Sequence, residues 1–250
     1  MNDASKILQS HNRNNEKTST RRNGMSAHRS FLQEVKTLLD VNPGSYRLLY
    51  TEPKSLDSHY YFVGLNPGGL ETSESDIFVE SGNAILNENW GGNKKSALQN
   101  QMIYFFQDMA TILGKTALWM EYMSNEWLIS NYVFYRSPSW DIMAKKAEHI
   151  STSKEIWRKI FSRKVPKIIV ANGYETHKYM VSLLQEFGWT KKEESRSCKA
   201  WDGPHIVVME LEDKLCLTVG FAHLSHFPVI RREKNKSCNQ ALYEKIKQFH

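Results

Sequence analysis

Continuous apolar runs alternate with amphipathic segments along most of the chain. The run HYYFVGL at 59–65 has the length of a strand and no polar alternation, which is typical of a central strand buried on both faces. Comparable runs are LISNYVFY (128–135), KIIVANG (167–173), PHIVVMEL (204–211) and KLCLTVGF (214–221). Because helical patterns separate most of them, the sequence predicts a three-layer α/β/α sandwich with a central, mostly parallel sheet.

Helical spacing of apolar residues predicts the intervening elements. The first segment, 26–40, places Phe31, Leu32 and Val35 on one face and has Ser26 as a possible N-terminal cap. The others are 96–114, 117–127, 151–163, 174–188 and 239–249. A polar, glycine-containing stretch at 68–95 is long for a connection, and loops of this length are often functional.

The composition of the first residues predicts how the chain is divided into domains. Residues 1–24 are polar and basic without periodicity, which predicts a disordered basic arm followed by a single domain at 25–250. No segment approaches the run of about 18 apolar residues that a membrane span needs, and the first residues lack the apolar block of a signal peptide. We therefore expect a cytoplasmic protein with no membrane contact.

The net charge and the cysteine spacing limit the kinds of partner and metal site that the sequence supports. The chain has 33 Lys and Arg against 27 Asp and Glu, and the net charge of +6 is compatible with a polyanionic partner without demanding one. Cys198, Cys216 and Cys238 share no C-x-x-C spacing, which argues against a disulfide framework, a structural zinc or an iron–sulfur cluster. We expect reduced cysteines, no metal and no cofactor.

Polar residues follow the predicted strands. NPGG follows the first, RSPSW the second, NGYE the third and AHLSHFP the last. Ligands of such sheets bind at the carboxyl ends of the strands, where Asn66, Asn131 and His223 would supply donors and acceptors suited to a planar heterocycle. Each residue also has a purely structural interpretation. Asn-Pro-Gly, for example, is a turn former in which Gly68 tolerates a positive φ.

Four short motifs, spanning about residues 58–230, resemble those of the uracil-DNA glycosylase superfamily. VGLNPGG resembles its first motif, most closely in the mismatch-specific and single-strand-selective branches, and FAHLSHF is similar to a divergent second motif. LISNYVFYRSP and IIVANGYET resemble the two strand segments between them. Phe78 lies twelve residues after Asn66, a separation similar to that of the aromatic residue that stacks on the flipped base in this superfamily.

The resemblance implies a role for each matching residue. Asn66 would position the attacking water, Phe78 would stack on the base, Asn131 would read its edge, and His223 would stabilise the leaving group. The phosphate-contacting and wedge positions of the second motif are occupied by Ser225, His226 and Phe227. Phe227 is the candidate wedge, with core packing as the alternative.

The sequence also departs from the family pattern. Leu224 and His226 replace both prolines of the second motif, which puts the conformation of that loop in question. The most active uracil-removing members carry Asp where Asn66 stands, and an amide can orient a water but cannot act as a base. If a base is needed, the adjoining loop offers acidic residues, which are otherwise solvated side chains: Glu71, Glu74 and Asp76.

Other basic and aromatic residues are candidates for DNA contact. Arg136, Arg231 and Arg232 could hold phosphates, although such residues are often only solvated. The tryptophans that could stack on a base or serve the core are Trp90, Trp140 and Trp201.

The resemblance predicts a DNA glycosylase that flips a base out and leaves an abasic site, and we expect the protein to be a monomer. In the strictly uracil-specific branch, a tyrosine stands at the position of Gly68 and collides with any substituent at C5 of the base. The resemblance therefore implies that glycine at this position admits 5-substituted pyrimidines as well as uracil, including hypermodified cytosines of phage DNA. Base repair and antiphage defence are both compatible with this substrate range. The alternatives are a DNA-binding module of the same fold without catalysis, or a fold-level likeness with a pocket for a small ligand.

Overall fold

In the computed structural model, the predicted apolar strands lie side by side in one sheet. Within residues 28–79, 82–197 and 203–250, which the structure describes, the sheet has six strands in the order β2-β1-β3-β6-β5-β4. They are β1 (Tyr60–Gly64), β2 (Trp127–Asn131), β3 (Ile168–Asn172), β4 (Thr190–Arg196), β5 (His205–Leu211) and β6 (Lys214–Phe221). Strands β2, β1, β3 and β6 are parallel, while β5 pairs antiparallel with β6 and with β4. The sheet is mostly parallel, as predicted.

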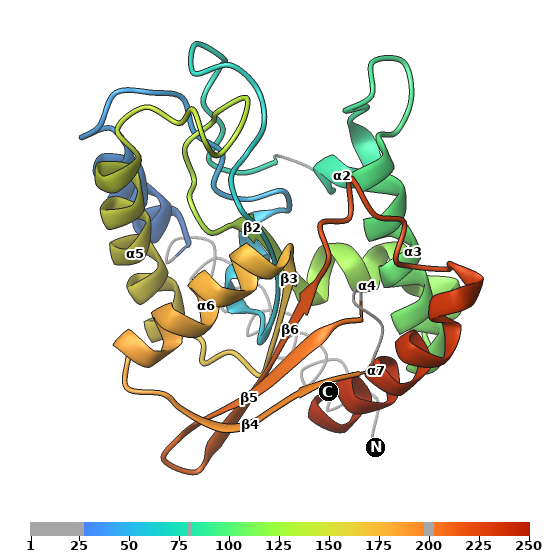
Figure 1. The fold of residues 1–250 in the computed structure, drawn as a ribbon. Helices are drawn as coiled ribbons and strands as arrows, with labels where there is room; N and C mark the ends of the chain where they lie inside the picture. The colour runs from blue at the N-terminus through green and yellow to red at the C-terminus, as the bar shows by residue number, and fades with distance from the viewer. Residues whose placement is uncertain (1–27, 80–81, 198–202) are drawn as a thin grey trace, which may run out of the picture. The chain divides into compact units, whose positions relative to one another are not determined.

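Helices cover both faces of this sheet (Figure 1). They are α2 (Ala84–Asn87), α3 (Ala97–Ile112), α4 (Trp119–Glu126), α5 (Lys146–Arg163), α6 (Tyr174–Glu186) and α7 (Lys236–Phe249), with short 3-10 turns at Pro53–Asp57, Thr116–Leu118 and Glu233–Asn235. Alternate residues of β1 face opposite layers. Tyr61 stacks on Phe161 of α5, whereas Phe62 packs against Phe105 of α3. The architecture is therefore a three-layer α/β/α sandwich.

The strand register brings the carboxyl ends of the parallel strands to one edge. Gly64, the last residue of β1, pairs with Asn131, the last residue of β2. Asn172 at the end of β3 pairs with Phe221 at the end of β6. The loops that leave these four strands consequently start next to one another.

Several element boundaries differ from the sequence-based expectation. Strand β2 ends at Asn131, and residues 132–135 continue as buried chain beyond the end of β1. Helix α5 starts at Lys146 and α7 at Lys236, in both cases earlier than the apolar periodicity indicated. Strand β4 was not predicted, because its sequence TKKEESR is almost entirely exposed and has no apolar face. Lysine and glutamate are common on such edge strands because they discourage edge-to-edge association.

The chain divides into two units, residues 1–41 and 42–250. In the first, residues 28–39 form the predicted helix. The predicted arm at 1–24, the proposed cap Ser26, Cys198 and Trp201 lie outside the described residues. Cys216 is free and buried, whereas Cys238 is disulfide-bonded, which corrects the expectation of reduced cysteines for this residue. In the described part of the chain, no helix has the length and apolar character needed to cross a membrane.

Candidate functional site

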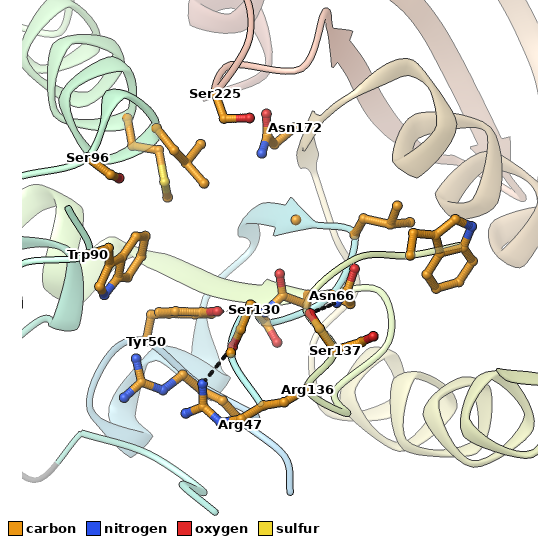
Figure 2. A pocket seen from close by; sticks show the side chains of 18 of the residues that line it. Arg47, Tyr50, Asn66, Trp90, Ser96, Ser130, Arg136, Ser137, Asn172 and Ser225 are labelled. Atoms are coloured by element: carbon orange, nitrogen blue, oxygen red, sulfur yellow. Dashed lines mark hydrogen bonds between the residues drawn. The ribbon is translucent and has the colours of Figure 1, made fainter. Parts of the chain in front are cut away.

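A cavity of about 900 Å³ opens at the carboxyl ends of the parallel strands. Leu65 and Asn66 after β1, Asn131 at the end of β2, Asn172 at the end of β3, and His223 after β6 all line it. In Figure 2, Asn172 and Ser225 lie at the top of the view and Trp90 and Ser96 on the left. Tyr50, Arg47 and Arg136 lie towards the bottom, and we call the part of the wall around the two arginines the cavity floor. The position and size are those expected for a ligand site in an open α/β sheet.

Asn66 joins two of the loops that form the cavity wall. Its Nδ2 donates to the carbonyl oxygens of Pro67, at 3.0 Å, and Ser137, at 3.2 Å. Two carbonyl partners identify this atom as the nitrogen, so Oδ1 is the atom left to accept a hydrogen bond. Asn66 can therefore orient a water through Oδ1 while its nitrogen holds the loop.

The turn after Asn66 has a different conformation from the one that we expected. The positive φ, +106°, occurs at Gly69 and not at Gly68. Gly68 is exposed, and a Cβ built on it meets no atom within 4 Å. Glycine at position 68 therefore leaves open space at the cavity wall, whereas glycine at 69 is required by the backbone.

Asn131 is buried and is held in a defined orientation. Its Nδ2 donates to the hydroxyl of Tyr50 at 2.9 Å, and its side chain lies against Gly64 on the neighbouring strand. Burial raises the pKa of Tyr50, so the phenol stays protonated and has its own proton to donate. Asn131 and Tyr50 together present a polar pair in the cavity wall.

Gly64→Ala is expected to displace the Asn131 amide, because a Cβ at position 64 would lie 2.3 Å from Oδ1 of Asn131. Overpacking of this kind costs about 1–3 kcal/mol. Urea unfolding should show that loss, while Gly68→Ala, whose Cβ has open space, should leave the unfolding free energy nearly unchanged. Equal stabilities of the two variants would contradict this packing.

His223 and Ser225 form a hydrogen-bonded pair in the loop after β6. Ser225 Oγ lies 2.7 Å from Nδ1 of His223. When the hydroxyl donates to Nδ1, the ring proton is on Nε2, which leaves Nε2–H as a donor for a ligand. Burial, with a smaller contribution from His226, lowers the pKa of His223. The imidazole is therefore neutral at pH 7.

Asn172 supports the same loop from β3 and was not singled out in the sequence. Its Oδ1 accepts a hydrogen bond from the backbone N–H of Leu224 at 2.8 Å. Figure 2 shows the amide nitrogen on the cavity side of this residue. Asn172 is the last residue of β3, as Asn131 is of β2, and this equivalent position was the available signal.

The cavity floor is a charged network. Arg47 binds Asp76 and Glu88, both at 2.8 Å, and Arg136 binds the same Asp76 at 2.8 Å. Burial opposes ionisation of Glu88, but hydrogen bonds from Arg47 and Trp90 outweigh it and hold the pKa of this carboxyl below its usual value. The floor is thus charged, with its charges paired to one another.

Trp90 and Tyr50 supply aromatic surface above this network. Both line the cavity, and their rings meet edge to face with centroids 5.4 Å apart. The indole Nε1 donates to Glu88 at 2.8 Å, which fixes the ring. Arg47, Tyr50 and Glu88 were not predicted as site residues.

The remaining predicted site residues fall into two groups. Those that line the cavity with Asn66, Asn131 and His223 are Gly68, Arg136, Ser225 and His226. Those that are not among the lining residues are Phe78, Phe227, Arg231 and Arg232.

The residues outside the cavity have other surroundings. Phe78 is 37% exposed. Phe227 is partly buried against the core, in line with the alternative interpretation given for it. Arg231 pairs with Asp108 at 2.9 Å, whereas Arg232 is exposed.

The three loop acids differ in the structure. Asp76 is committed to the two arginines, and Glu71 accepts a hydrogen bond from the N–H of Ala144 at 3.4 Å. Glu74 lines the cavity and is exposed. Among the described residues, no three His, Cys, Asp or Glu side chains are grouped so that they could hold a metal ion.

No protein-family model and no curated protein sequence matches the chain.

Proposed function

We propose that this protein is a DNA glycosylase that hydrolyses the N-glycosidic bond of a flipped-out uracil or 5-substituted pyrimidine and leaves an abasic site. The observation that carries the proposal is the convergence of Asn66, Asn131 and His223 on one cavity at the strand ends. These are the residues to which the motif resemblance assigns water positioning, base reading and leaving-group stabilisation.

The proposed chemistry needs stabilisation of charge more than a strong nucleophile. An N-glycosidic bond breaks through an oxocarbenium-like sugar, and negative charge grows on the departing base. The Nε2–H of a neutral His223 would donate to O2 of the pyrimidine, with Ser225 holding the tautomer. A water bound to Oδ1 of Asn66 would then capture the sugar, and the proton lost by that water passes to solvent or to the released base.

The base would be read by Asn131 and Tyr50 and stacked by an aromatic ring. Because Phe78 does not line the cavity and Trp90 does, Trp90 takes the stacking role in this proposal. The open space at Gly68 and a cavity of about 900 Å³ leave room for a substituent at C5 of the base. This room supports modified pyrimidines of phage DNA as substrates beside uracil, and with them an antiphage role.

The proposal is tested by alkali-dependent strand cleavage. Oligonucleotides and phage DNAs carrying uracil, mismatched thymine, 5-hydroxymethylcytosine or glucosylated cytosine are incubated with the protein, with Asn66→Ala and His223→Ala as controls. Cleavage of one substrate that is lost in both variants is the expected result. Cleavage that persists in both variants would reject the assignment of these residues.

A DNA-binding module without catalysis is the second candidate. It is favoured by the two hydrogen bonds through which the Asn66 amide braces the loops, since bracing alone would account for this residue. This candidate predicts salt-sensitive DNA binding with no abasic sites on any of the substrates named above.

Glu74→Gln is expected to lower the rate of base release by about tenfold or less. Glu74 lines the cavity and is exposed, and a dissociative reaction asks little of a base. Single-turnover kinetics across pH would measure this. A loss of about 10²–10⁴-fold, with loss of the acidic limb of the pH profile, would instead identify Glu74 as a general base.

A further inference from the structure

Two large apolar side chains are conspicuously exposed beside the cavity. Among the described residues of unit 42–250, Ile142 and Leu70 are the most exposed large apolar side chains, at 67% and 64%. Leu70 directly follows the cavity-lining Gly69, and Ile142 lies two residues after the cavity-lining Trp140. Neither side chain lines the cavity itself, but both belong to loops whose neighbouring residues do.

The backbone on both sides of these residues is held in place. The carbonyl oxygen of Leu70 accepts hydrogen bonds from Ser73 N, at 3.0 Å, and Ser45 Oγ, at 3.1 Å. Ile142 lies in a turn closed by the N–H of Met143 on the carbonyl of Trp140, and the Met143 side chain is buried. Both apolar side chains thus stand on braced turns.

The two loops also contact each other. Glu71, next to Leu70, accepts a hydrogen bond from the N–H of Ala144, two residues after Ile142. Lys145 and Lys146 follow directly. Lys145 is half exposed and lies 3.9 Å from Glu148, and Nζ of Lys146 is 4.8 Å from the centre of the Trp140 ring. Two exposed apolar side chains thus stand on contacting loops that carry both acidic and basic residues, and the two lysines are the groups that could meet a phosphate backbone beside unstacked bases.

We propose that Leu70 and Ile142 form the wedge that enters the duplex where the target nucleotide leaves it. The inference rests on the proposed function, because it assumes that the cavity receives a flipped base. Leucine and isoleucine are among the side chains that unstack base steps in this way. Phe227, the candidate from the sequence, is partly buried against the core and has less of its ring available.

The test uses duplex DNA with 2-aminopurine next to the target base, since the fluorescence of this analogue rises when it is unstacked. The variants are Leu70→Ala, Ile142→Ala and the double substitution. The matched control is Leu118→Ala, which removes a large apolar side chain that is 54% exposed in the 3-10 turn Thr116–Leu118, a segment that contributes no residue to the cavity. Thermal melts establish that all the variants fold.

The double variant should lose most of the fluorescence rise and release the base from duplex DNA roughly 10- to 100-fold more slowly. Release from single-stranded DNA, where there is no stack to open, should stay within about twofold of the wild type. An unchanged fluorescence rise, or an equal loss of rate on both kinds of DNA, would overturn the wedge.

The fluorescence experiment also distinguishes failure of the wedge proposal from failure of the proposed function. A wild-type protein that unstacks the duplex through Leu70 and Ile142 but cleaves no substrate would support the wedge and reject the glycosylase. A wild-type protein that releases bases without any fluorescence rise would reject the wedge and leave the glycosylase standing.

Discussion

His223→Ala is expected to lower the rate of base release by about 10²–10³-fold, the usual cost of removing one donor to a developing anion in a water-poor site. His223 lines the cavity, and its Nδ1 is occupied by Ser225. In the proposed mechanism the lost interaction is made mainly in the transition state, so the maximal single-turnover rate should fall while the enzyme concentration that gives half of this rate changes little.

Ser225→Ala is the matched control for this prediction. It keeps the imidazole but removes the hydroxyl that holds the ring proton on Nε2, so it should cause a smaller loss than His223→Ala. If both variants lowered the rate of base release by the same factor, the role of His223 would be to hold the loop and not to contact the base.

The pH dependence supplies a second check on the charge of His223. Burial, and to a smaller extent His226, lowers the pKa of His223 below its usual value of about 6.5, so the neutral ring predominates at pH 7 and above. The rate ratio of wild type to His223→Ala should therefore fall on acidification with a midpoint below about pH 6.5. A ratio that instead rises on acidification would show that the imidazolium is the active form.

Much of the site can be predicted from the sequence because strand ends are encoded locally. Apolar runs identify the central strands, and parallel strands place the residues that follow them at one edge. Asn66, Asn131 and His223 converge for this reason. The prediction for Phe78 rests on its separation from Asn66, and a count of residues along a loop does not fix the direction of a side chain.

The cavity floor could not be predicted, because it depends on contacts between segments far apart in the sequence. Isolated bridges pair Tyr46 with Tyr135 and Arg47 with Asp76. Backbone hydrogen bonds from Arg47 to Phe134 and from Tyr50 to Ile129 hold this segment beside β2 and the chain that follows it. Neither Arg47 nor Tyr50 lies in a motif or at a predicted strand end. Edge strand β4 was missed for a different reason, since its exposed charged residues have no apolar alternation.

Asn66→Asp is expected to lower both stability and the rate of base release, although the most active uracil-removing members of the family that the chain resembles carry Asp at this position. In this protein the Asn66 nitrogen donates to the carbonyl oxygens of Pro67 and Ser137. A carboxylate would face two acceptors with no proton to offer, at a cost of about 1–3 kcal/mol. Urea unfolding and single-turnover cleavage would measure the two losses.

The pH dependence of the stability loss distinguishes an unpaired carboxylate in Asn66→Asp from the mere loss of the amide in Asn66→Ala. Two carbonyl oxygens disfavour the ionised form, so the aspartate in the folded variant should have a pKa above the unfolded value of about 3.9. A raised folded-state pKa means that stability is lost as pH rises from the unfolded pKa through the folded one, so the deficit relative to wild type should be larger at pH 8 than at about pH 4. Asn66→Ala adds no titrating group, and its deficit should be the same at both values. A faster rate in Asn66→Asp, or equal deficits at the two pH values, would show that the amide nitrogen does not hold these two loops together.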